Sequence, residues 1–277
     1  MIGQNVVRIG QPHGAGATTR RSTINADYQF VPRPISAMPK DFPAGARSGI
    51  HSHPRGQLLF CCAGVMEVTA STSVWLVPPQ RALWVPIGID HEVRCRGAVS
   101  LRTIYVAPSV IPADWPCRPT VVRVSPLLRE LILRAVTMPI LYDESGPDGL
   151  VAQLLLSEFE WERSSLLSLQ TPSDPRLGEM YWQLIDDPRN ALTLEEWAER
   201  LALTPRTLAR RINAETGTSF VTWRKQIRLL AALPRLAQGE NVLSVALDVG
   251  YETSSAFCRM FKELTGSTPS AYFSASP

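Results

Sequence analysis

The stretch Ala246-Leu-Asp-Val-Gly-Tyr-Glu-Thr-Ser-Ser-Ala-Phe-Cys-Arg-Met-Phe261 decides the fold of the second half of the chain. Apolar residues recur at three- and four-residue steps on both sides of Gly250, which predicts two short helices joined by a tight turn. A similar pattern occurs about 49 residues earlier, from Leu194 to Gly217. Such helix pairs are typical of helix-turn-helix units, which place their second helix in the major groove of DNA.

Local signals mark where these helices begin. Thr193 and Glu196 form a capping box, and Thr204-Pro205 is typical of the start of a second helix. In the later copy, Asn241 and Thr253 occupy the corresponding capping positions. The agreement of these signals in both copies predicts an all-α domain with two helix-turn-helix units.

A long apolar helix is expected between the two units, over about residues 220–237, with Pro234 kinking it or ending it early. The net charge of the whole chain is only +3, so overall charge does not indicate a polyanionic partner. Locally, six basic residues stand against one acid, Glu215. They are Arg206, Arg210, Arg211, Arg224, Lys225 and Arg228. This local excess predicts contacts to phosphates.

Residues 176–277 resemble the DNA-binding domain of the AraC/XylS transcription regulators. The resemblance rests on the quoted stretch, with Lys262 after it, and on Gly266-Ser-Thr-Pro-Ser-Ala-Tyr272. It implies that each second helix reads base edges and that the two units read successive major grooves, roughly 34 Å apart. The base-reading positions that it implies are Arg206, Ala209, Arg210, Ser254, Ser255, Cys258 and Arg259.

Arginine reads guanine through two hydrogen bonds and serine bonds several bases, whereas an alanine methyl can at most contact thymine. Cys258 is a poor hydrogen-bonding group and is expected to specify little. For each arginine, contact to phosphate is an equally weighted alternative to base reading. Arg211 points away from the face of Arg206 and Arg210, and is predicted to contact the DNA backbone.

The first half of the chain predicts a β-rich domain over residues 28–112, preceded by a disordered tail over residues 1–27. Short stretches rich in Val, Leu, Trp and Phe alternate there with Pro and Gly turns, as in a β-sandwich or barrel. The predicted strands are Gln57–Cys62, Val65–Ala70, Ser73–Val77, Ala82–Pro86, His91–Cys95 and Ser100–Val106.

Three of the four histidines lie in this domain. His51-Ser-His53 is expected to place two imidazoles on the same face of a strand. With Gly64 and Pro86-Ile-Gly-Ile-Asp-His91, this spacing resembles the two motifs of the cupins, small β-barrels that hold a divalent metal. The resemblance implies a site formed by His51, His53, Gln57 and His91.

Gln57 stands where the cupin pattern has a glutamate, and Cys95 where it often has an asparagine. A site of three imidazoles suits zinc, nickel, copper or iron, but a neutral amide is a weaker fourth ligand than a carboxylate. The alternative is that the histidines line a pocket for an organic effector.

The string from His51 to Leu58, together with Trp75–Ala82 and Trp84-Val-Pro86, resembles a subgroup of AraC/XylS regulators with a cupin sensor domain. The resemblance covers roughly residues 45–277. It implies a ligand-responsive regulator, with a neighbouring transporter gene as a target. The fold class is therefore β plus α in two domains: an N-terminal cupin-like barrel, a helical linker and the C-terminal all-α domain.

Residues 113–175 are predicted to form the linker, with amphipathic helices over 126–138 and 150–161. These helices either pack on the barrel or pair between two subunits of a homodimer; an exposed leucine stripe favours the dimer. Pro172-Ser-Asp-Pro175 is typical of a short linker into the DNA-binding domain.

Composition excludes several classes of protein. We expect no membrane span, because the chain has no apolar run of about 18 residues, and no secretory signal peptide. Five cysteines without a Cys-x-x-Cys pair suit a reducing cytoplasm. The alternative function is a metal-dependent cupin enzyme fused to a DNA-binding domain. Since no separate acid–base pair is evident, we predict a regulator rather than an enzyme.

Overall fold

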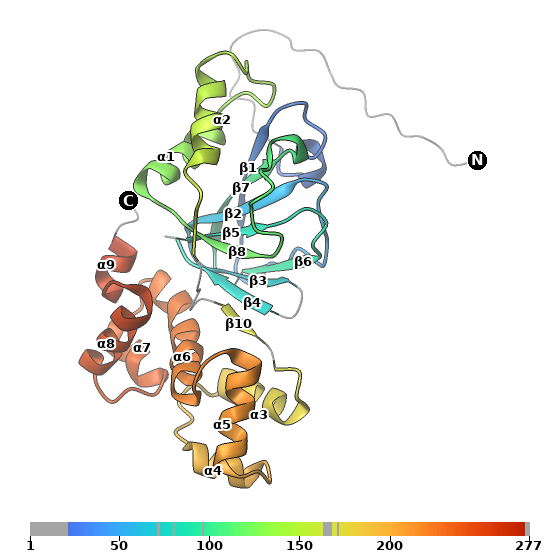
Figure 1. The fold of residues 1–277 in the computed structure, drawn as a ribbon. Helices are drawn as coiled ribbons and strands as arrows, with labels where there is room; N and C mark the ends of the chain where they lie inside the picture. The colour runs from blue at the N-terminus through green and yellow to red at the C-terminus, as the bar shows by residue number, and fades with distance from the viewer. Residues whose placement is uncertain are drawn as a thin grey trace.

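The computed structural model describes residues 22–70, 73–79, 81–95, 97–162, 168–170 and 172–274. A β-rich N-terminal domain and a helical C-terminal domain are stacked along the long axis of Figure 1. The β-rich part contains β1 (Ile35–Phe42), β2 (Gly56–Ala63), β3 (Met66–Ala70), β4 (Ser73–Val77), β5 (Arg81–Val85), β6 (His91–Cys95), β7 (Val99–Val106), β8 (Thr120–Arg123), β9 (Glu160–Trp161) and β10 (Ser168–Gln170). It also contains the short 3-10 helices η1 (Asn25–Tyr28) and η2 (Pro108–Val110) and the α-helices α1 (Pro126–Ala135) and α2 (Pro147–Ser157).

The strands form two antiparallel sheets. Sheet A has the order β1-β7-β2-β5-β8-β9, and sheet B has the order β10-β4-β3-β6. The predicted β-rich N-terminal domain is confirmed, but the described strands do not close into one barrel, because no ladder of hydrogen bonds joins the two sheets into a ring. Each of the six predicted strands is present to within about two residues, whereas β1, β8, β9 and β10 were not predicted.

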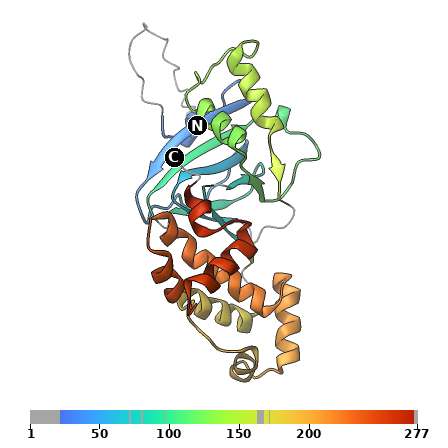
Figure 2. The same cartoon turned by 90° about the vertical axis from the view of Figure 1, so that its left-hand side faces the viewer.

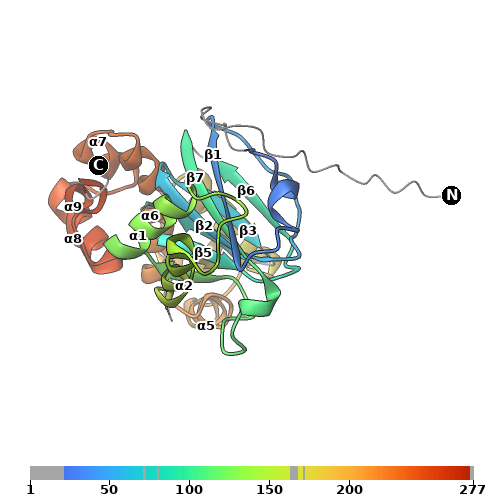
Figure 3. The same ribbon diagram turned by 90° about the horizontal axis from the view of Figure 1, so that it is seen from above.

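One core lies between the two sheets, and a second covers the other face of sheet A. The core between the sheets contains Leu59 and Leu83 of sheet A and Val68 and Val93 of sheet B. On the other face, Phe60, Trp84 and Ile104 pack against Leu128 and Ile132 of α1. Figure 3 shows α1 and α2 lying across sheet A. Since sheet A is buried on both faces, its central strands lack a strict alternation of apolar and polar residues.

Two expectations for the N-terminal half need correction. His51 and His53 precede β2 rather than lying in a strand; His51 is joined to His91 by an isolated β-bridge. Residues 1–21 of the expected disordered tail lie outside the described residues, but residues 25–27 belong to η1. The next residue, Tyr28, is fully buried, which anchors this segment.

The C-terminal domain contains α3 (Pro175–Asp186), α4 (Leu194–Arg200), α5 (Pro205–Thr216), α6 (Phe220–Ala237), α7 (Val242–Asp248), α8 (Ser254–Thr265) and α9 (Pro269–Ser274). Pro234 does not end α6 early. Proline removes one hydrogen bond of the helix, but buried Leu229, Leu230, Leu233 and Leu236 hold both sides of it in the core.

The two domains share apolar contacts through the outer face of sheet B. Val65 and Leu76 belong to the same buried cluster as Tyr181 of α3 and Ile227 of α6. Figure 2 shows the red helices α8 and α9 beneath the β-rich domain. None of the described helices is long and apolar enough to cross a membrane.

Candidate DNA-binding surface and histidine cluster

Two helix pairs, α4–α5 and α7–α8, have matching local geometry. Thr204 accepts a hydrogen bond from the amide of Thr207 at 3.2 Å, and Thr253 accepts one from Ala256 at the same distance. Thr193 and Glu196 form the predicted capping box. These caps satisfy amides that a helix start leaves without partners, so the sequence places the start of each helix.

The turns between the paired helices need a residue with positive φ. Gly250 supplies it after α7, with φ at 85°. After α4 the corresponding residue is Ala202, at φ 53°, where an L side chain is strained. Backbone bonds from Leu203 to Ala198 and from Tyr251 to Ala246, at 2.8 and 2.9 Å, close the two turns alike. The sequence analysis missed Ala202, because alanine gives no signal for a left-handed conformation.

Each second helix buries one face and leaves the opposite face outside. Leu208 and Ile212 of α5, and Phe257 and Phe261 of α8, are fully buried in one core. The predicted base-reading residues Arg206, Arg210, Ser255 and Arg259 are exposed. Ala209, Ser254 and Cys258 are half-buried, and Cys258 packs against the core.

Four of the six basic residues expected to contact phosphates have partners inside the protein. Arg211 pairs with Asp174 at 2.6 Å, and Lys225 pairs with Glu263 at 2.8 Å. Arg224 donates to the carbonyl of Leu192 at 2.9 Å, and Arg228 to that of Pro188 at 3.0 Å. The backbone role predicted for Arg211 therefore competes with an ion pair that holds α5 against the start of α3.

The other three arginines on the recognition helices differ from Arg211, and Lys262 of α8 is exposed as they are. Arg206, Arg210 and Arg259 form no hydrogen bond or ion pair with any residue that the structure describes. They are distributed over both helices, two on α5 and one on α8. Three exposed guanidinium groups without partners are available to an external acceptor.

The second candidate site lies in the β-rich domain. The rings of His51 and His91 are 4.4 Å apart, and His53 lies 4.9 Å from His51 and 5.4 Å from His91. Their ligand atoms all lie within 4.8 Å of one another. Within the described residues, this is the one group of three or more His, Cys, Asp or Glu side chains that is close enough to hold a metal ion. The structure thus gathers the three predicted histidines from two segments about 40 residues apart.

The hydrogen bonds of the cluster orient its rings. Nδ1 of His51 lies 2.9 Å from the carbonyl of Gly49, and Nδ1 of His91 lies 2.9 Å from that of Ile89. These carbonyls select the tautomer with the proton on Nδ1 and leave Nε2 with a lone pair. The Nε2 atoms of His53 and His91 are buried and have no hydrogen-bond partner.

Burial favours the neutral form of two of the three imidazoles, His53 and His91. It lowers the pKa of His53 to about 4, with further lowering from the charges of His51 and His91. Burial also lowers the pKa of His91. Neutral imidazole is the form that binds a metal, so the residues fit the group that the cupin pattern implies.

Gln57 lies on β2 directly opposite Tyr105 of β7, so both side chains are on one face of sheet A. The amide oxygen of Gln57 and the hydroxyls of Tyr105 and Thr103 are buried, and the side chains of Gln57 and Gln29 lie beside the Tyr105 hydroxyl. The ring of His53 is 5.2 Å from that of Tyr105. Tyr105 and Thr103 were not predicted as site residues; their alternation along β7 was the available signal.

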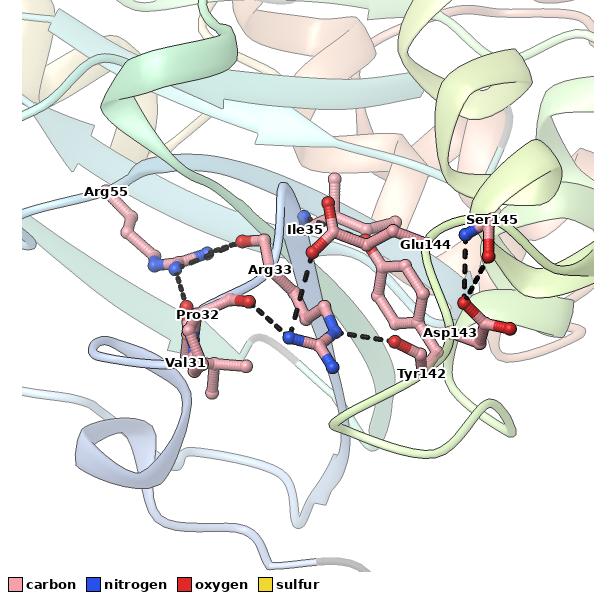
Figure 4. Close-up of polar contacts among 9 residues, drawn as sticks. All are labelled: Val31, Pro32, Arg33, Ile35, Arg55, Tyr142, Asp143, Glu144 and Ser145. Carbon is pink, nitrogen blue, oxygen red and sulfur yellow. Dashed lines mark hydrogen bonds and ion pairs between the residues drawn. The ribbon is translucent and has the colours of Figure 1, made fainter.

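Arg55, between His53 and Gln57, is a further residue that the sequence analysis did not assign. Its guanidinium is buried and donates to the carbonyls of Gln29, Val31 and Arg33, part of which Figure 4 shows. In the same view Arg33 reaches across to Tyr142 and Glu144 of the loop between α1 and α2. These contacts join the segment before β1 to Arg55, two residues after His53, and to the loop between α1 and α2.

Comparison with known proteins identifies the family. Residues 197–275 match the model of a helix-turn-helix domain. The HTH-type transcriptional regulator NimR of Escherichia coli (strain K12) is 33% identical over 225 residues, which cover 81% of this chain and 82% of NimR.

The chain belongs to the AraC/XylS family of transcription regulators.

Two further similarities bear on this regulator. The Arabinose operon regulatory protein of Escherichia coli (strain K12) is 28% identical over 137 residues, or 47% of this chain and 44% of that protein. A structure of ToxT from Vibrio cholerae O395 covers 88% of this chain and all of the ToxT chain, at 11% identity and a TM-score of 0.38. The family places the protein among DNA-binding transcription regulators.

Proposed function

We propose that this regulator reads DNA through two helix-turn-helix units, α4–α5 and α7–α8. The observation that carries this proposal is that some basic residues of the domain have partners inside the protein and others do not. Arg206, Arg210 and Arg259 are exposed and without partners in the described structure, while Arg211, Arg224, Lys225 and Arg228 are engaged internally. Arginine at such positions bonds guanine through two hydrogen bonds, so α5 and α8 are the recognition helices.

The experiment begins by selecting high-affinity duplexes from a random pool with the full-length protein. Fluorescence anisotropy then compares wild type, Arg210→Ala and Arg259→Ala on every single-base variant of the selected site. We expect each variant to relax the preference at one base pair, the two positions lying about one helical turn apart. Uniform weakening on all sequences, with base preferences unchanged, would show that these arginines contact phosphates alone.

We also propose that His51, His53 and His91 hold a divalent transition metal, with the amide oxygen of Gln57 as the fourth ligand. Three imidazoles with Nε2 available and two Nδ1 atoms on backbone carbonyls form the pattern of a histidine metal site. Bound there, a metal supplies a Lewis-acidic position to a ligand. The test is the metal content of untagged protein by elemental mass spectrometry, beside a His51→Ala/His53→Ala variant.

About one equivalent of metal that the double variant loses is the expected result. Equal metal in both proteins, or none in either after reconstitution with zinc, cobalt and nickel, would refute the site. An organic-effector pocket would then be the remaining function of these histidines.

Sheet B offers a route from this site to the DNA-binding domain. His91 lies on the inner face of β6, opposite Ala70 of β3. On the outer face, Leu76 of β4 packs with Ile227 of α6. A ligand that favours one arrangement of sheet B would therefore favour one arrangement of α6 and of the recognition helices beside it. We expect DNA affinity to change with metal or effector in wild type and not in the double histidine variant.

Finally, we propose that the regulator is a homodimer through α2. Leu150 and Leu154 are one helical turn apart and 65% and 43% exposed, so α2 presents an apolar strip to solvent. Light scattering at micromolar concentration should give a dimer for wild type and a monomer for Leu150→Glu/Leu154→Glu. Val221→Glu, at an exposed apolar residue of α6, is the matched control. A dimer that survives in the double variant would place the interface elsewhere.

A further inference from the structure

The charge around the histidine cluster is unbalanced. All 25 Asp and Glu residues of the sequence lie within the described part of the chain. None contributes an oxygen to the group formed by His51, His53 and His91. Asp90 precedes His91 in the chain but is exposed to solvent, which screens its charge. The candidate ligands are therefore three neutral imidazoles and one neutral amide, and a divalent metal among them would keep its full charge of +2.

A second positive charge lies in the same loop. Arg55, two residues after His53, is 5% exposed. Its hydrogen bonds all go to main-chain carbonyls, which carry no net charge. Burial lowers the pKa of Arg55, but an arginine stays protonated. Buried charges in proteins are normally compensated by a group of opposite sign.

The other end of the site provides hydrogen-bond donors. The hydroxyls of Tyr105 and Thr103 are buried, and the two residues alternate onto the face of sheet A that carries Gln57, whose side chain lies beside the Tyr105 hydroxyl. A phenol carries its proton at neutral pH, so the Tyr105 hydroxyl can donate a hydrogen bond to an acceptor. Because the Tyr105 ring is 5.2 Å from that of His53, one small molecule can reach both the metal position and this hydroxyl.

We infer that the ligand of this site is a small organic anion, in its simplest form a carboxylate. One oxygen bonds the metal held by the histidines, and the rest of the anion accepts a hydrogen bond from Tyr105. The inference rests on the metal site proposed above. The inference also assigns a role to Gln57: its neutral amide lets the site prefer an anionic ligand. A glutamate at this position would neutralise part of the metal charge before the anion binds.

The test uses full-length protein loaded with cobalt(II), whose visible spectrum reports a change of ligands. Acetate and acetamide are the probes, since they have nearly the same shape and differ in charge. We compare wild type with Gln57→Glu and Tyr105→Phe. Gln183→Glu, on the exposed side of α3, is the control that adds the same charge away from the site.

Acetate should change the cobalt spectrum of wild type and of Gln183→Glu, with acetamide at least about tenfold weaker. In Gln57→Glu, cobalt should bind more tightly and acetate about tenfold or more weakly, because the added carboxylate repels the anion. Tyr105→Phe should weaken acetate several-fold and leave cobalt binding unchanged.

Equal affinity for acetamide and acetate, or unchanged acetate affinity in Gln57→Glu, would overturn the inference while leaving the metal site intact. Failure of wild type to bind cobalt would overturn both. DNA binding, measured by anisotropy on the same preparations, separates these outcomes from a failure of the regulator itself.

Discussion

Adjacent arginines on α5 should have opposite roles, and this is the sharpest test of the described DNA-binding domain. Arg210 is exposed and unpartnered in the described structure, whereas Arg211 forms an ion pair with Asp174 at 2.6 Å. The side chains of Arg211 and Asp174 are 39% and 20% exposed. Such a pair is screened by solvent, but its short charge-assisted hydrogen bond places it at the upper end for surface pairs, about 1 kcal/mol.

Arg211→Ala should therefore lower the free energy of unfolding by about 1 kcal/mol, which corresponds to roughly 2–8 °C in melting temperature. Its DNA affinity should change less than about threefold. Arg210→Ala should leave the melting temperature within about 1 °C of wild type, because its side chain is exposed and forms no hydrogen bond or ion pair in the described structure. Its DNA affinity should fall by about 1–3 kcal/mol, or roughly 5- to 150-fold.

The assays are thermal denaturation by circular dichroism and fluorescence anisotropy on a selected duplex at fixed salt. Asp174→Asn is the matched control: it removes the charge but keeps a side-chain oxygen for the amide of Arg176, which Asp174 caps at 2.9 Å. Its destabilisation should not add to that of Arg211→Ala, since both remove one interaction. If Arg211→Ala and Arg210→Ala weaken DNA binding equally and neither lowers stability, the reasoning about the ion pair is refuted.

Three other substitutions test the local geometry by thermal denaturation. Gly56→Ala should cost about 1–3 kcal/mol, because its Cβ would lie 2.1 Å from the ring of Trp84; no loss would mean that the ring moves freely. Gly178 lies in α3, and a Cβ there would be 3.9 Å from its nearest neighbour outside the adjacent helix backbone, the carbonyl oxygen of Pro172, so Gly178→Ala should raise the free energy of unfolding by up to about 1 kcal/mol. A lower free energy of unfolding would contradict the space found there. Ala202→Gly should stabilise by about 1 kcal/mol by relieving the positive φ, whereas a destabilised variant would show that the turn has another conformation.

Local sequence determined much of this protein. The caps at Thr193, Thr204 and Asn241 give the starts of three helices, since each hydroxyl or amide oxygen satisfies amides within three residues. The positions of the six predicted strands follow in the same way from apolar stretches between turn residues. The family could be recognised from one stretch, because the turn glycine, the buried face and the arginine of a recognition helix lie within about 16 residues.

Tertiary structure alone decided which charged side chains are left unpaired and can contact DNA or another ligand. Arg211 and Asp174 are 37 residues apart, and Lys225 and Glu263 are 38 apart, so no local pattern reveals that these pairs exist. The convergence of His51, His53 and His91 was suggested by spacing, but the buried hydroxyl of Tyr105 and the carbonyl partners of Arg55 were not. Helix caps and strand patterns depend on neighbours along the chain, whereas the pairing and burial of charge depend on segments that meet only after folding. That physical difference is why the sequence determined the elements and the family, and the folded chain determined which residues can meet a ligand.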